Sequence, residues 1–266
     1  MAYQQENIRG DDPAVTKLYG DRTVATSCQY FVSHVAKGAN ILDVGCGPGF
    51  ITSDLAKIAS EGKTIGLDNS SGIIEQAAAA FPPSDVPNLS FVVGDATNFS
   101  EYTDNTFDIV HSHQVLVHLP NAVTAIKEYY RVCKPGGIIA IRDSSPAIVL
   151  SLKPDLPGIR AYWDRAMATM AKMGGNTEAG NKLEEWATEA GLGKDGGKLV
   201  YSKSPMRSPS HTHRTVGQPA EMAIQYGMAS KEEMDDWHKA WVEWDETDGS
   251  EFVFECGEIL CWKVSK

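Results

Sequence analysis

The sequence predicts an α/β protein with a doubly wound, mostly parallel sheet of seven strands. In the first half, short apolar segments typical of buried strands alternate with amphipathic segments typical of helices. A glycine-rich turn, "GCGPG", separates the first expected strand from the helix that follows it. No long Gly, Ser or Pro linker interrupts the 266 residues, so we expect one domain over 1–266.

The expected elements follow one another in a regular order. Five strands are expected in the first half, at 40–45, 63–68, 89–95, 107–112 and 137–143. Helical spacing there covers 22–36, 50–60, 71–80 and 121–133. The second half predicts helices at 156–173, 176–190, 216–228 and 230–245, with strands at 197–204 and 250–263 and a loop over 204–214. We interpret 15–143 as the core, and 151–192 and 211–248 as helical cap insertions.

Composition narrows the classes of partner. The formal charge is −11, which argues against nucleic acid, because binding phosphates needs clustered Lys and Arg. The polar start "MAYQQENIRGDD" is unlike a signal peptide, and no apolar run approaches the ~18 residues of a membrane span. The five cysteines are scattered and show no zinc-site spacing. We therefore expect a reduced, cytoplasmic protein without a bound metal.

The stretch "ILDVGCGPGF" (41–50) combines a strand, a glycine turn and a helix start. This arrangement presents backbone N–H groups to a ligand. Its spacing is G-x-G-x-G, whereas dinucleotide-binding turns show G-x-G-x-x-G. Asp43 beside the turn would repel a pyrophosphate, but it suits the ammonium and sulfonium groups of S-adenosylmethionine (SAM). A nucleotide oxidoreductase is therefore the less favoured interpretation.

Several motifs resemble those of SAM-dependent methyltransferases of the Rossmann-like class. "LDVGCGPG" resembles their first motif, "GDATNF" the motif after strand three, "FDIVHSHQVLVHL" the strand-four motif and "RVCKPGGIIAI" the turn into strand five. Together they cover about residues 15–143, each at its expected strand end. The chain is most similar to the ubiquinone/menaquinone-biosynthesis-type branch, which methylates small molecules.

The resemblance implies a set of cofactor-binding residues. Asp68 would bind both ribose hydroxyls, Asp95 the adenine amino group and the Ala96 N–H a ring nitrogen. Tyr19 would cover the methionine end, and Arg22 would reach its carboxylate. The full set is Tyr19, Arg22, Asp43, Gly45, Gly47, Gly49, Asp68, Asn69, Asp95, Ala96 and Ser112. Alternatives stay open: the glycines also suit a tight turn, the acids also suit strand-end turns, and Asp21 could cap the first helix with Tyr19 packed beside it.

The acceptor side is expected just past strand four, where His113 and Gln114 follow the strand end. If the methyl acceptor is a hydroxyl or a carbon acid, His113 could remove its proton near pH 7. The alternative is that His113 only packs. His211 and His213 could face the pocket or the solvent. Methionine and tryptophan stripes share single helix faces, as core or as pocket lining: Met167, Met170 and Met173, and Trp237, Trp241 and Trp244.

These features predict a methyl transfer from SAM to a small apolar or aromatic molecule. The alternative is a protein that uses the SAM-binding fold without methyl transfer, as a regulatory subunit or for another reaction. The sequence leaves the acceptor atom, the pathway, the use of a base and the oligomeric state open.

Overall fold

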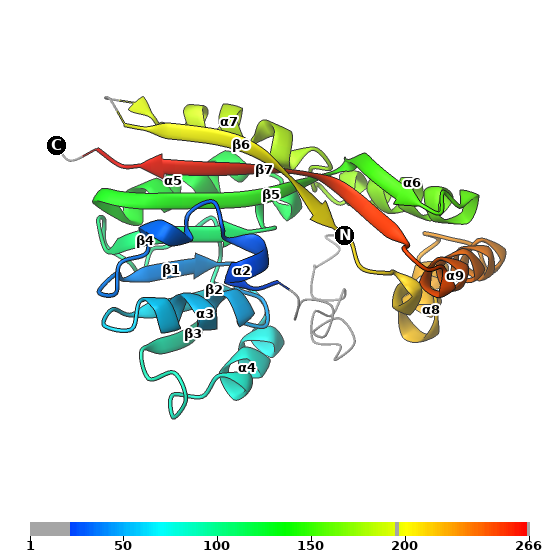
Figure 1. Cartoon of the computed structure of the whole chain (residues 1–266), viewed down its shortest axis with the longest axis horizontal. Coiled ribbons are helices and arrows are strands. Elements are labelled where there is room, and N and C mark those ends of the chain that lie inside the picture. Colours follow the sequence, from blue (N-terminus) through cyan, green and yellow to red (C-terminus); the bar gives the residue numbers. More distant parts are fainter. Residues whose placement is uncertain (1–21, 195–196, 265–266) are drawn as a thin grey trace.

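A computed structural model describes residues 22–194 and 197–264 and shows one seven-stranded sheet (Figure 1). The strand order is β3-β2-β1-β4-β5-β7-β6, in which the first five pair in parallel and β7 runs antiparallel to both neighbours. The predicted doubly wound, mostly parallel sheet is therefore confirmed. The bounds are β1 Ile41–Val44, β2 Thr64–Asp68, β3 Leu89–Val93, β4 Phe107–His113, β5 Cys133–Lys153, β6 Leu199–Arg207 and β7 Glu251–Trp262.

Helices cover both faces of the sheet. α2 and α3 lie on one face, and α5 and α7 lie on the other (Figure 1). The α-helices are α2 Val24–Ser27, α3 Phe50–Ile58, α4 Ser71–Ala80, α5 Ala122–Val132, α6 Pro157–Lys172, α7 Ala179–Ala190, α8 Gly217–Gln225 and α9 Lys231–Glu246. Short 3-10 helices are η2 Val32–His34, η3 Leu116–His118 and η5 Thr212–Arg214.

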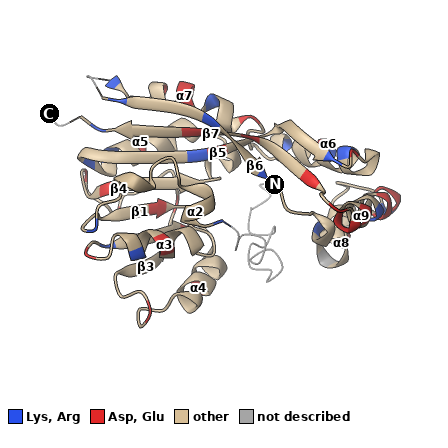
Figure 2. Ribbon diagram, viewed as in Figure 1, with Lys and Arg blue, Asp and Glu red and all other residues tan. Residues whose placement is uncertain are grey.

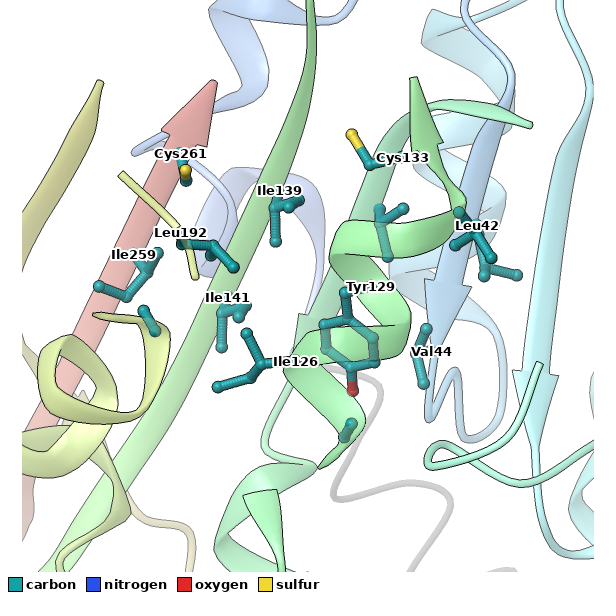
Figure 3. Packing of buried hydrophobic residues seen from close by; sticks show 14 of the residues in the cluster. Leu42, Val44, Ile126, Tyr129, Cys133, Ile139, Ile141, Leu192, Ile259 and Cys261 are labelled. Carbon is teal, nitrogen blue, oxygen red and sulfur yellow. The ribbon is translucent and has the colours of Figure 1, made fainter. Parts of the chain in front are cut away.

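Two apolar clusters hold the sheet between these helices. On the α5 and α7 face, alternate strand residues such as Leu42, Ile139 and Ile259 pack against Ile126 and Tyr129 of α5 (Figure 3). The residues between them point to the α2 and α3 face, where Ile41 and Ile109 belong to the second cluster. Burial on both faces explains why the strand segments are almost continuously apolar.

The expected helix over 22–36 is wrong. Only Val24–Ser27 is α-helical, followed by a turn and the 3-10 helix Val32–His34. Thr23 starts α2 with a capping box, and Cys28 ends it. The helical spacing reflected the burial of Val24, Cys28 and Phe31, which a single turn followed by a bend also achieves. β-branched residues are frequent in this stretch, and they are weak helix formers.

β5 is much longer than the expected 137–143. It continues to Lys153 and stays paired with β7, with register shifts between Ser145 and Val149 and between Val149 and Ser151. Pro146 lies at the first shift, where a strand can accommodate a residue that has no N–H. Because proline interrupts the strand pattern, the sequence did not predict this extension.

The extended ends of β5 and β7 carry a helical cap made of α6, α8 and α9. Figure 1 shows these helices grouped beyond the carboxyl ends of the parallel strands. α6 packs against α9, and Trp163, Trp237, Trp241 and Phe252 share one buried cluster. The tryptophan stripe is therefore core. α7 lies within the expected cap range 151–192 but packs on α5, β5 and β7 instead.

His211 lies inside the cap, not in solvent. Its ring is 5.3 Å from the Trp241 ring and 5.5 Å from the Trp163 ring, between centroids. Its Nδ1 lies 3.2 Å from the Tyr162 hydroxyl, and its Nε2 lies 3.1 Å from the Ser208 hydroxyl. Burial first, then the charge of Arg214, lowers the pKa of His211 well below 6.5, so the ring is neutral. The strand β6 also extends to Arg207, into the segment expected as a loop.

A buried ion pair joins the two central strands. Asp43 of β1 and His111 of β4 are register partners, and Asp43 Oδ1 lies 2.7 Å from His111 Nδ1. Thr52 of α3 donates to Asp43 Oδ2 at 2.6 Å, and the Cys28 sulfur lies 3.7 Å from His111 Nε2. Burial lowers the pKa of His111, but Cys28 and Asp43 outweigh burial and raise it to about 10. The pair therefore ties α2 and α3 to the sheet.

Removing one member of this pair should destabilise the protein more than removing both. His111→Leu leaves the Asp43 carboxylate buried without its charged partner, which should cost about 3–5 kcal/mol. The double variant Asp43→Leu/His111→Leu removes that charge and should be closer to wild type. Urea unfolding of wild type, Asp43→Leu, His111→Leu and the double variant gives the cycle. If the losses of the two single variants simply add, the pair has no coupling and this account is wrong.

The pair should also make stability depend on pH. The pKa of His111 is raised from 6.5 to about 10, so the folded state holds the proton more tightly than the unfolded state. The resulting stabilisation is fully present below pH 6.5 and is lost as the pH rises through about 10. Urea midpoints between these values should fall more steeply for wild type than for His111→Leu. Equal slopes in the two proteins would contradict a charged His111.

Candidate functional site

The glycine turn between β1 and α3 differs from an ordinary turn in its backbone angles and in the space around its three glycines. Gly45, Gly47 and Gly49 all have positive φ, at 67°, 52° and 84°. A Cβ on Gly45 would lie 2.3 Å from a methyl of Val115, and one on Gly49 would lie 2.6 Å from the Phe91 ring. A Cβ on Gly47 would meet no atom within 4 Å. Packing therefore requires two of the glycines, while open space adjoins the middle one.

Asp68 ends β2 directly beside this turn. Its Oδ2 accepts from the Gly47 N–H at 3.1 Å, and its Oδ1 accepts from the Ser70 N–H at 3.1 Å. Burial raises the pKa of Asp68, while the N–H groups of Ser70 and Gly47 oppose that rise. The side chain is only partly buried, and the neighbouring Asn69 is exposed. The carboxylate therefore has a fixed position at the edge of the space next to Gly47.

The loop after β3 brings Asp95 and Ala96 to the same end of the sheet. Asp95 is exposed, and its Oδ1 accepts from the N–H and the hydroxyl of Thr97, both at 2.7 Å. Farther along the loop, Glu128 accepts from the Phe99 N–H at 2.8 Å, and Arg131 donates to the Phe99 carbonyl at 2.9 Å. α5 thus holds the loop, and its tip stays open to a ligand.

Asp43 lies beneath the turn rather than in the open space. It is only 2% exposed, and each of its oxygens already has a partner, in Thr52 and His111. Direct contact between Asp43 and a cofactor stays a prediction. What the structure shows is that the carboxylate anchors the strand end from which the glycine turn departs.

The end of β4 places its polar residues on alternate faces. Ser112 is fully buried, two residues after Val110 on the α5 face, so its hydroxyl lies within the core. His113 lies on the opposite face with His111 and is 8% exposed. Gln114 leaves the strand with φ 60°, a strained value for a residue other than glycine. Its Nε2 lies 3.7 Å from the Cys256 sulfur of β7, where the core meets the cap.

Asp143 of β5 holds the segment after β4, and the sequence did not point to it. Its carboxylate accepts from the N–H groups of Val115, Leu116 and Val117, at 3.2, 2.8 and 3.0 Å. Burial raises the pKa of Asp143 to about 7, against the lowering effect of these N–H groups. This carboxylate therefore keeps Val115 against Gly45 and stabilises the strained turn at Gln114. The signal in the sequence was an acid at the end of an apolar strand.

A row of polar residues crosses the sheet beside His113. Arg142 of β5 is the register partner of His113 on one side and of Glu258 on the other. Arg142 Nη1 donates to His113 Nε2 at 3.2 Å, and Arg142 Nε donates to Glu258 Oε1 at 3.1 Å. Ser204 of β6 donates to Glu258 Oε1 at 2.7 Å. Burial, then the charges of Arg22, Arg142 and His111, lowers the pKa of His113 well below 6.5.

The predicted N-terminal contacts are only partly visible. Tyr19 lies outside the described residues. Arg22 is half-buried, and its charge acts on His113, so it lies at the same end of the sheet as the glycine turn. The structure thus brings together Arg22, Gly47, Asp68 and His113 around the carboxyl ends of β1, β2 and β4.

Charged residues also gather on the cap, away from the glycine turn. Within residues 22–194 and 197–264, no group of three or more His, Cys, Asp or Glu side chains could hold a metal ion. Acidic residues gather on α9 of the cap, as Figure 2 shows. A cleft between α6 and α9, lined by Asp164, Arg165 and Glu233 among others, lies on the cap and contains none of the residues around the turn. None of the described helices is long and apolar enough to cross a membrane.

Known methyltransferases resemble this chain in sequence. The family model described as "Methyltransferase domain" matches residues 36–198. An uncharacterized methyltransferase of Schizosaccharomyces pombe is 30% identical over 278 residues, covering 94% of each chain. The demethylmenaquinone methyltransferase of Listeria welshimeri is 32% identical over 143 residues, covering 52% of this chain and 57% of that protein.

Solved structures share the fold. Phosphoethanolamine N-methyltransferase 2 of Haemonchus contortus, in complex with S-adenosylhomocysteine, has a TM-score of 0.59 at 16% identity, covering 95% of this chain and 57% of that one. The cyclase SpnF has a TM-score of 0.51 at 22% identity, covering 95% and 82%. The arrangement of the glycine turn and strands, the family match and the full-length similarity agree: this chain belongs to the methyltransferase-domain family with a Rossmann-like fold.

Proposed function

We propose that this protein transfers a methyl group from SAM to a small molecule. The observation that carries the proposal is the open space at Gly47 with the Asp68 carboxylate fixed beside it. A backbone turn without side chains admits the body of a ligand, and a carboxylate at its edge suits hydroxyl groups such as those of a ribose. The residues present therefore fit SAM.

Each part of the site has a distinct task in this proposal. Asp68 accepts hydrogen bonds from the ribose hydroxyls, and the held loop at Asp95 and Ala96 receives the adenine. Arg22 reaches the carboxylate of the methionine end. The charge of His111, which lies beneath the turn, is balanced by the Asp43 carboxylate 2.7 Å away. SAM itself supplies a methyl carbon activated by its sulfonium, so the chain must mainly position the acceptor.

The acceptor is proposed to lie between the end of β4 and the cap. Gln114 faces Cys256, and the Cys256 sulfur lies 3.6 Å from that of Met206. These side chains, together with Phe254, line the junction with apolar and polarisable groups, which suits a small apolar or aromatic acceptor. A SAM-binding protein without methyl transfer remains the second candidate, because the cyclase SpnF shares the fold. Transfer of radiolabel from methyl-labelled SAM to an acceptor collection separates the two.

Cofactor choice gives the first test. The protein should bind SAM and S-adenosylhomocysteine, and it should show no detectable binding of NAD, because the glycine turn has the spacing G-x-G-x-G and the Asp43 carboxylate lies beneath it, where it would repel a pyrophosphate. Isothermal titration calorimetry with all three ligands measures this. Tighter binding of NAD than of S-adenosylhomocysteine would contradict the proposal.

Asp68→Ala should weaken S-adenosylhomocysteine binding by roughly ten- to a thousand-fold, since a single hydrogen bond to a charged group is worth about 1.5–3 kcal/mol and the second ribose hydroxyl adds to that loss only in part. Asp68→Asn keeps one acceptor oxygen and should lie in between. Asp248→Ala, at an exposed position beyond α9, is the matched control. Calorimetry on proteins with equal circular dichroism gives the comparison, and an unchanged dissociation constant for Asp68→Ala would remove this residue from the site.

A further inference from the structure

His113 is held by a partner that can only donate hydrogen bonds. A guanidinium has five N–H donors, no acceptor, and no accessible neutral form. The contact of 3.2 Å from Arg142 Nη1 therefore requires a lone pair on His113 Nε2. Because Nε2 is the acceptor, the single proton of the neutral ring lies on Nδ1.

The remainder of the row makes this arrangement rigid. Glu258 and Ser204 fix the Arg142 guanidinium from the side opposite His113, at 3.1 and 3.4 Å from Nε. Arg142 Nη2 also donates to the Pro205 carbonyl at 3.1 Å. Arg142 is 5% exposed, so water does not replace these contacts. The positive charge of Arg142, with Arg22 and His111 also near the ring, opposes a second proton on His113.

Nδ1 of His113 lies on the side of the ring away from Arg142. Among the described residues no acceptor lies within hydrogen-bond distance of Nδ1, and the residue keeps 8% of its surface exposed. In the pairing of β1 with β4, Asp43 is the partner of His111, and Val44 is the partner of Ser112. The next position along each strand is Gly45 on one side and His113 on the other. His113 thus lies next to the start of the glycine turn, and one residue before Gln114 at the junction with the cap.

We infer that Arg142 fixes His113 as the Nδ1–H tautomer, and that this N–H donates to an oxygen of the methyl acceptor instead of removing a proton from it. This inference rests on the proposed function and names its substrate class: a phenolate or enolate, ionised when it binds. The electron pair of the acceptor forms the new bond to the methyl carbon as the carbon–sulfur bond breaks, and the pair of that bond stays on sulfur. The acceptor anion becomes neutral, so no proton passes to His113.

The tautomer is measurable without any turnover. Long-range proton–nitrogen correlation spectra of the full chain with labelled histidine, saturated with S-adenosylhomocysteine, report which ring nitrogen carries hydrogen. The chain has seven histidines, and spectra of His113→Gln identify the signals of His113 by their loss. We expect the Nδ1–H pattern, unchanged between pH 6 and pH 8. An Nε2–H or imidazolium pattern would overturn the inference.

Two conservative variants then test the donor role. The asparagine side chain places its amide N–H close to the position of Nδ1, whereas glutamine reaches the position of Nε2 and faces Arg142. His113→Asn should therefore keep turnover within about five-fold of wild type, and His113→Gln should lose roughly ten- to a hundred-fold, the value of one hydrogen bond to an ionised group. The reverse order, or equal losses in both folded variants, would contradict the donor role.

The acceptor collection for this assay contains phenols, enolisable dicarbonyls, amines and thiols, each with methyl-labelled SAM. Labelling of phenols or enols supports the substrate class, and labelling confined to amines or thiols overturns it. If no compound is labelled although S-adenosylhomocysteine binds, both the inference and the methyl transfer are wrong. If S-adenosylhomocysteine does not bind, the proposed function fails first, while the tautomer measurement still stands on its own.

Discussion

The buried pair of Asp43 and His111 is the constraint on which the site depends. It joins β1 to β4 at the point where the sheet reverses its strand order, and ligands in this class of fold bind at such a point. A carboxylate buried this deeply must be paired, since an isolated buried charge is costly. With the strands joined there, Gly45 meets Val115, and the turn acquires a shape that only glycines can adopt.

Pairing of buried polar side chains also continues across the sheet from β4 to β6. His113, Arg142, Glu258 and Ser204 lie side by side on four strands, each with a hydrogen-bond partner in the next. A buried row of this kind contributes little net stability, because desolvation offsets the attraction between its charges. Its main effect is geometric: the strands cannot slip by one residue without separating several partners at once.

The sequence predicted all seven strands of the sheet, because alternation of buried strands with helices is a local pattern. It also singled out Asp68, Asp95 and the three glycines, which the structure places at or just after strand ends, and their contact with a cofactor stays a prediction. The roles of Arg142, Asp143 and Glu258 were not predicted, because they depend on how β5 pairs with β4 and with β7, which no short segment encodes. The helix predicted over 22–36 was wrong because the spacing of apolar residues shows which residues are buried but does not fix the backbone conformation that buries them.

The extension of β5 and β7 into the cap has a mechanical consequence. No flexible linker separates the cap from the core on this side, since both strands run without a break from one to the other. A movement of the cap relative to the core would therefore require the paired strands β5 and β7 to bend. The register shifts on either side of Val149 interrupt the regular pairing, so bending would concentrate at this point of the connection.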